Sequence, residues 1–249
     1  MMTIIRSAAG GSARRIALAY RLGGRALVFA PMLVFPAIVT ELVQHAAEIH
    51  LGMFVSLAAF RGLAMDPTRW AFGYAKVAGF LLTTLLVARF WAVDGVMARI
   101  PRISGRAGGR LVLGILASFA IAAADHGLAR QGGPIAVAAS IVDFLISTAL
   151  TLYLMGALLD DERITLRWSF TAGWPKAVMM TLLAVTVFVP CQLLHLLDHR
   201  LAIGSPLAVV IPIMIWDALF VGLFAALVGS AAFVGFRYGP SWRGWDRKP

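Results

Sequence analysis

Long runs of apolar residues constrain the fold of this chain more than any other feature. A bilayer core about 30 Å thick needs roughly 20 apolar residues for one helix to cross it. Hydrophobic residues make up 60% of the 249 and charged residues only 14%, which excludes a soluble domain. The sequence predicts an all-α polytopic membrane bundle that forms a single integral membrane domain over residues 1–249. Its six predicted transmembrane helices are 25–43, 77–98, 111–124, 135–159, 177–197 and 207–236.

Basic residues are distributed unevenly between the segments that join these runs. With six crossings, the N-terminal segment, the 99–110 loop, the 160–176 loop and the tail share one side and carry five, four, three and four Lys or Arg residues, sixteen in all. The other side carries five, and Arg89 lies within a helix. Because basic residues in short loops stay in the cytoplasm, we expect cytoplasmic N- and C-termini and a bacterial inner (plasma) membrane location.

The expected partners follow from the same charge distribution. The formal net charge is +10, and anionic lipid headgroups on the cytoplasmic face account for it. Membrane lipids are therefore the predicted partners, nucleic acid is not, and a homo-oligomer is compatible with the pattern.

Three local signals add detail to this outline. The basic, glycine-rich stretch before the first run has no small-residue cleavage site, so we expect the first helix to remain as an anchor. Asp66 followed by Pro67 is the pattern of an N-cap and a proline at the first helical position, so the second helix is expected to begin near residue 67. Cys191 is the only cysteine, which excludes an internal disulfide and a multi-cysteine metal centre.

Three segments on the expected cytoplasmic side share one pattern. Residues 14–25, 99–110 and 163–176 each combine arginine with a glycine-containing turn and end in a basic residue at the start of an apolar helix. They suggest three two-helix units, with coincidence in an Arg- and Gly-rich chain as the alternative. In the third segment, Trp168 and Trp174 stand among basic residues, which is typical of a helix in the headgroup layer.

The C-terminal third carries a further sequence motif. Arg167-Trp168-Ser169-Phe170 precedes an apolar helix, and a last helix rich in small residues ends in Phe236-Arg237-Tyr238. In these features residues 163–243 resemble the membrane-domain family found fused to glycerophosphodiester phosphodiesterases, together with its YciC-like relatives. The resemblance implies about six helices and a multi-pass membrane protein without settled biochemistry. No phosphodiesterase catalytic domain is expected in this chain.

Charged residues inside the predicted apolar helices are the first candidate site. Ionisable groups within a bilayer are costly and mark functional sites by default. At about 1.5 Å per residue, Arg89, Asp143 and Asp217 reach the middle of the membrane, whereas Asp94 lies nearer the cytoplasm. We predict that these four residues form an intramembrane polar cluster in which Arg89 pairs with Asp143, Asp217 or both. The cluster can fix the register of the helices, or it can form a pathway for substrate or protons.

Histidines and carboxylates form a second candidate site in the outer half of the predicted topology, where all five histidines fall. Glu41 and His45 are four residues apart on one helical face, as are His195 and His199. Imidazole and carboxylate together suit Zn²⁺ or a similar ion, so these four residues are the predicted ligands of a divalent metal. The alternatives are interfacial histidines that only form hydrogen bonds and, less favoured, a haem.

Three functions are compatible with these features. The first is the handling or transport of a small molecule or lipid through the intramembrane polar cluster. The second is a non-catalytic protein that assembles or organises the membrane, in which the same charges are structural. The third and least favoured is a metal-dependent membrane enzyme that uses the outer His and carboxylate set. No nucleotide-binding glycine motif in strand–helix context and no serine-hydrolase motif occurs.

Overall fold

The computed structural model describes residues 11–129 and 133–240, without the side chains at 122, 123, 125–127 and 129, so Asp125 and His126 lie outside the described side chains. Within these ranges the chain is helical apart from turns and has no strand, which confirms the all-α prediction. The elements are α2 (Ser12–Phe29), η2 (Pro31–Leu33), α3 (Phe35–His50), η3 (Met53–Val55), α4 (Leu57–Gly62), α5 (Pro67–Ala92), η4 (Met97–Arg99), α6 (Gly105–Ala129), α7 (Gly133–Leu158), α8 (Leu166–Ser169), α9 (Trp174–Ala202) and α10 (Leu207–Tyr238).

Four of these helices, α5, α7, α9 and α10, are long and apolar enough to cross a membrane. They correspond to the predicted helices 77–98, 135–159, 177–197 and 207–236. The structure therefore supports a membrane protein, and the prediction of six transmembrane helices is wrong for the residues that it describes.

The first predicted helix, 25–43, is interrupted at Pro31. α2 ends at Phe29, Ala30 has φ −147°, and Pro31 begins the 3-10 turn η2 before α3 starts at Phe35. Proline lacks the amide N–H that a continuous helix needs at this position, so the helix breaks here. Two shorter helices replace one span.

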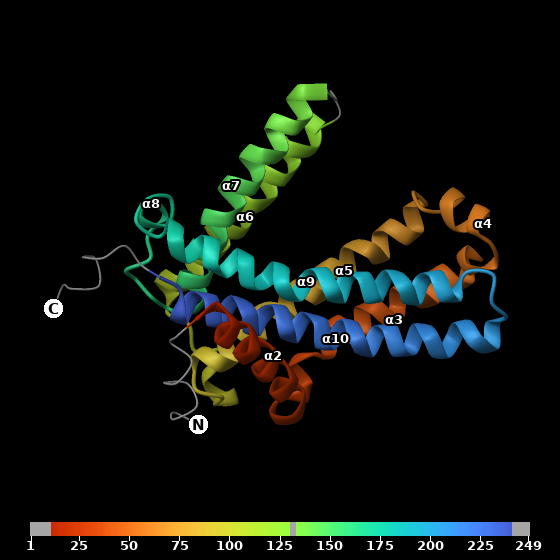
Figure 1. Ribbon diagram of the computed structural model, residues 1–249, viewed down its shortest axis with the longest axis horizontal. Coiled ribbons are helices and arrows are strands. Elements are labelled where there is room, and N and C mark those ends of the chain that lie inside the picture. Colours follow the sequence, from red (N-terminus) through yellow and green to blue (C-terminus); the bar gives the residue numbers. More distant parts are fainter. Residues whose placement is uncertain (1–10, 130–132, 241–249) are drawn as a thin grey trace.

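The third predicted helix, 111–124, forms part of α6 but is not among the four candidate spans. The first turns of α6 hold two arginines and three glycines, which shortens its apolar part. α6 packs along α7, and Figure 1 shows the two as a hairpin that projects away from the other helices.

α10 is the helix on which the bundle is built. It lies beside α9 and also contacts α2, α3 and α5 (Figure 1). A side chain at Gly229 of α10 would clash with the Thr84 carbonyl oxygen of α5, and one at Gly79 of α5 would clash with Thr40 of α3. Small residues let membrane helices approach to backbone distance, so α3, α5 and α10 form a tightly packed group.

α5 begins where the sequence predicted but ends earlier. Asp66 caps its start as predicted, accepting from Thr68 N at 2.8 Å and from Arg69 N at 3.2 Å. The helix ends at Ala92 rather than at residue 98, because Asp94 and Gly95 adopt left-handed φ values of 57° and 78°. Both residue types tolerate this conformation, and Asp94 is thereby left exposed at a turn outside the helix.

The 99–110 and 160–176 segments, which carry seven basic residues, meet at one end of the bundle. There Ser104 Oγ donates to Asp160 Oδ1 at 2.7 Å, and Arg106 pairs with Glu162 at 3.1 Å. The hydrogen bond from Ser104 is the main reason that the pKa of Asp160 is lowered from its ordinary value. The loops predicted to be cytoplasmic thus share one end, while the side of the membrane stays a prediction.

Trp168 departs from the predicted headgroup-layer helix. α8 is a single turn, capped by Thr165 Oγ1, which accepts from Trp168 N at 3.1 Å. The Trp168 side chain is buried and packs closely against Gly173. Its ring belongs to the core of the bundle, so the prediction is wrong for this residue.

Candidate functional site

Buried polar side chains of α3, α9 and α10 meet two partly buried basic side chains of α5 inside the bundle. Three of the acids, Glu41, Glu48 and Asp217, are fully buried. We call the whole set the polar cluster. Its members are Glu41, Gln44, His45 and Glu48 of α3, Arg69 and Lys76 of α5, His195, Asp198 and His199 of α9, and Asp217 of α10.

The helical repeat explains why these side chains face one another. Glu41, His45 and Glu48 follow the spacing i, i+4, i+7 and share one face of α3, and His195 and His199 share one face of α9. α3 and α9 both pack on α10. The two polar faces therefore meet at Asp217, on α10.

Asp217 accepts hydrogen bonds from two other helices. Its Oδ1 lies 2.7 Å from His195 Nδ1, and its Oδ2 lies 2.8 Å from His45 Nε2. An ionised carboxylate can only accept, so both imidazoles donate. His45 Nδ1 in turn faces Glu48 Oε2 at 3.1 Å. A doubly protonated ring at His45 therefore satisfies both of the acids that it contacts.

Two basic side chains of α5 reach the acids of α3. Arg69 Nε donates to Glu48 Oε1 at 3.0 Å, and Lys76 Nζ lies 2.8 Å from Glu41 Oε1. Lys76 Nζ is also 3.2 Å from His195 Nε2. An ammonium group can only donate, so His195 accepts at Nε2 and donates at Nδ1, which fixes its neutral tautomer.

Arg69 and Lys76 were not predicted as site residues, because both fall in a segment that was expected to form an outer loop. Their spacing of i, i+7 places both on one face of α5. A basic pair at the same spacing as Glu41 and Glu48 was the signal that would have found them.

His199 is a buried member of the cluster whose polar atoms are unsatisfied. Its side chain is only 10% exposed, and neither ring nitrogen has a hydrogen-bond partner. Asp217 Oδ2 is 3.8 Å from Nε2, too far for a hydrogen bond. The ring lies instead among Phe54, Phe60 and His195, with centroid distances of 5.8, 6.1 and 4.7 Å.

All four predicted metal ligands lie in the polar cluster. Glu41, His195 and His199, together with Asp217, each offer one ligand atom within 4.8 Å of the others. His45 forms a second such group with Glu48 and His199. The rings of His45 and His199 are 5.3 Å apart, so α3 and α9 do bring their histidines together. Metal binding itself stays a prediction.

The predicted pairing of Arg89 with Asp143 or Asp217 does not occur in the structure. Arg89 Nη1 donates to the Leu158 carbonyl oxygen at 3.0 Å, and Nη2 donates to that of Arg102 at 2.7 Å. These acceptors belong to the basic end of the bundle. Arg89 thus joins the end of α5 to the end of α7 and to the loop before α6.

The other two members of the predicted intramembrane cluster also lie elsewhere. Asp143 accepts from Ser147 of its own helix at 3.2 Å, on the α6–α7 hairpin, and Asp94 is exposed at the end of α5. Only Asp217 belongs to the polar cluster. The prediction was based only on how deep each residue lies along its helix. Depth does not determine which face of a helix points into the bundle, or whether the helix packs in the bundle at all.

A groove of about 430 Å³ opens beside the polar cluster, between α5, α9 and α10. Apolar side chains form most of its wall, and Val77, Leu81 and Phe188 are 56%, 51% and 45% exposed. Lys76 and His195, both in contact with the polar cluster, also line it. The full lining is Lys76, Val77, Phe80, Leu81, Phe188, Gln192, His195, Val221 and Phe224.

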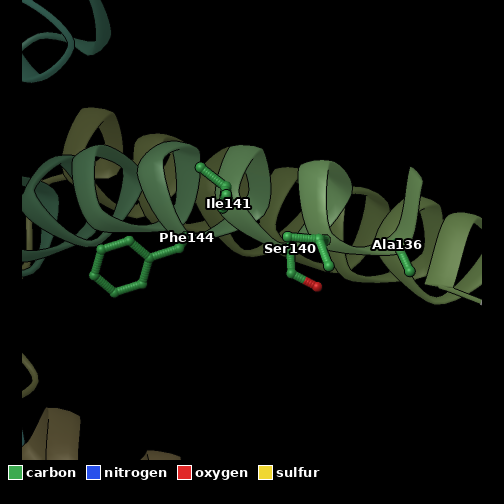
Figure 2. Close-up of a pocket in the computed structure, with 5 residues that line it drawn as sticks. Ala136, Ser140, Ile141 and Phe144 are labelled. Atoms are coloured by element: carbon green, nitrogen blue, oxygen red, sulfur yellow. The ribbon is translucent and has the colours of Figure 1, made fainter. Parts of the chain in front are cut away.

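A second hollow, of about 450 Å³, lies along the exposed face of α7. Figure 2 shows Ala136, Ser140, Ile141 and Phe144 on this one helix. Its lining has one hydroxyl and no charged group. This hollow is the open side of a helix, and it has no chemistry comparable to that of the groove.

Comparisons of the chain with protein-family models, with curated proteins and with solved structures gave no match. The resemblance to the phosphodiesterase-linked membrane-domain family therefore stays a prediction. The functional argument depends on the polar cluster and on the groove.

Proposed function

We propose that this protein binds an anionic amphiphile of the bacterial inner membrane in the groove between α5, α9 and α10. One acyl chain would lie along the apolar wall, and the charged head would contact Lys76 and His195. The function is thus the handling of a lipid-like molecule at a polar site within the membrane.

The observation that carries this proposal is that Lys76 and His195 each line the groove and also contact the acids of the polar cluster. Both side chains line an apolar groove that is open to lipid, and both contact buried acids on the other side. An ammonium group beside apolar walls complements a molecule with one hydrocarbon chain and one negative charge. An anionic head at Lys76 would compete with Glu41 for the same ammonium group, which couples the groove to the polar cluster.

Handling within the membrane is favoured over transport across it. The buried charges of the described residues fall into two separate groups, with the polar cluster in one half of the bundle and Arg89 at the basic end. The hydroxyl of Thr83, which lies on α5 between them, accepts from the Ala37 amide at 3.1 Å. It is thereby engaged in packing α3 on α5.

The experiment is a titration of the purified full chain in neutral detergent with lysophosphatidate, with monoacylglycerol of the same chain length, and with inorganic phosphate. We expect lysophosphatidate to bind at least about 10-fold more tightly than either of the others, because only it offers both chain and charge. Equal affinity for the charged and neutral amphiphiles would contradict the proposal.

Two tryptophan substitutions locate the site. Val77→Trp places a large ring at the rim of the groove and should abolish lysophosphatidate binding. Leu219→Trp is the control, because Leu219 is 52% exposed on α10 and lies outside the groove lining. Binding that survives Val77→Trp unchanged would place the ligand elsewhere.

A further inference from the structure

We infer that the polar cluster is a binding site for one divalent transition-metal ion, held by Glu41, His195, His199 and Asp217. This inference does not rest on lipid binding in the groove. It is argued from the ligand atoms, the unsatisfied groups, the hydrogen bonds that orient the ligands and the charges.

The four side chains already bring their ligand atoms close together. Each offers one N or O atom, and these atoms lie within 4.8 Å of one another. Zn²⁺ binds nitrogen and oxygen at roughly 2.0–2.1 Å, so ligand atoms on a tetrahedron around it are roughly 3.4 Å apart. Changes of side-chain torsion that move each ligand atom by about 1 Å would bring the four atoms to this separation. The helices that carry the four residues are rigid and need not move.

Two of the ligands have unsatisfied polar atoms directed into the cluster. His199 has no hydrogen-bond partner at either nitrogen, although the residue is only 8% exposed. Neither oxygen of Glu41 has a properly directed hydrogen bond, although the residue is 0% exposed and Oε1 lies at ion-pair distance from Lys76 Nζ (2.8 Å) and His45 Nε2 (3.2 Å). Buried polar groups without partners are rare in folded proteins, and a metal ion would satisfy these atoms together.

Hydrogen bonds prepare His195 for this role. His195 Nδ1 donates to Asp217 Oδ1 at 2.7 Å, so its lone pair is on Nε2, where it accepts from Lys76 Nζ at 3.2 Å. A bound ion would take the place of that ammonium group. A carboxylate that orients a ligand imidazole in this way is the usual support of a metal-binding histidine. Asp217 Oδ1 accepts from His195, and Oδ2, which accepts from His45, can give its second lone pair to the ion.

The charges favour a cation of this kind. Glu41, Glu48, Asp198 and Asp217 place four carboxyl groups in the cluster, against three positive charges, those of Arg69, Lys76 and the protonated His45. Lys76 Nζ already lies beside Glu41 and His195, so an ammonium group stands where positive charge is stabilised. Two imidazoles with two carboxylates suit Zn²⁺, Co²⁺ or Fe²⁺ and do not suit Mg²⁺ or Ca²⁺, which prefer oxygen ligands alone.

The test measures zinc in the full chain purified without a histidine tag, stripped with a chelator and equilibrated with ZnCl₂. We expect one zinc per chain in the wild type and in the control His50→Ala, which removes an exposed histidine of the same helix α3. Glu41→Gln and His199→Phe should each weaken zinc binding at least about 10-fold. Co²⁺ should give the visible absorption of a four-coordinate site, and His199→Phe should abolish it.

His199→Phe also separates a metal site from a packing role. Phenylalanine fits beside Phe54 and Phe60 and needs no hydrogen bond, so the metal-free variant should unfold at the same or a higher temperature than the wild type. Its thermal stabilisation by zinc should be lost. Lys76→Met should change zinc affinity in the opposite direction, because it removes a competing positive charge.

Two results would overturn the inference: no stoichiometric zinc in the wild type, or zinc binding by His199→Phe that equals the wild type. Val77→Trp should bind zinc normally while losing lysophosphatidate. Failure of the metal site and failure of the lipid proposal are therefore distinguishable.

Discussion

His195 and Asp217 face each other across the α9–α10 hairpin, with Nδ1 and Oδ1 2.7 Å apart. The same carboxylate binds His45 from α3 at 2.8 Å. A single buried acid therefore joins three helices and fixes the rings of two histidines. Removing this carboxylate should lower stability more than removing that of Asp143, which the sequence predicted to lie at a similar depth in the membrane.

Asp217→Asn should lower the free energy of unfolding by about 3–5 kcal/mol, the range found when one partner of a buried charged network is removed. Asp143→Asn is the matched control, because Asp143 is partly exposed and bonds only to Ser147 of its own helix. It should change stability by less than about 0.5 kcal/mol. Unfolding of both variants in detergent checks this, and equal effects would contradict the central position of Asp217.

Arg89→Lys should reduce stability by about 1–3 kcal/mol although the charge is kept. The guanidinium donates to the carbonyl oxygens of Leu158 and Arg102 at once, and an ammonium group lacks this forked geometry. One buried carbonyl is then left without a partner. Arg99→Lys, at an exposed position, should leave the thermal unfolding midpoint unchanged.

Ser104→Ala should make stability less dependent on pH in the acid range. Ser104 lowers the pKa of Asp160 in the folded protein relative to the unfolded chain, so its contribution is present above the unfolded pKa and is lost as pH falls through the folded pKa. The variant should melt at a lower temperature than the wild type at neutral pH. The difference should shrink as pH falls, to the part that remains because Ser104 Oγ also accepts from Ala107 N at 3.1 Å at the start of α6. A difference that grows as pH falls would contradict the assignment.

Membrane orientation is tested by cysteine labelling in a Cys191→Ala background. Gly109→Cys lies at the basic end of the bundle, and Met65→Cys lies at an exposed position just before the start of α5. If the basic end faces the cytoplasm, a membrane-impermeant maleimide should label intact cells at residue 65 and not at residue 109. The reverse pattern would invert the predicted topology.

The sequence by itself determined the membrane character of the protein, the all-α class, the four longest helices and the start of α5 at Pro67. Each of these depends on local chemistry: apolar runs of sufficient length, and an Asp-Pro pair that caps a helix. It also paired Glu41 with His45 and His195 with His199, because spacing along one helix is enough to place two side chains on one face.

The tertiary structure decided which helix faces meet. It brought Asp217, Arg69 and Lys76 to the histidines and sent Arg89 to two carbonyl oxygens at the other end of the bundle. It also left Asp143 on a hairpin that projects from the other helices (Figure 1). The physical reason is that helix periodicity fixes angles within a helix, whereas the rotation of one helix against another depends on packing, here on close contacts such as those at Gly79 and Gly229.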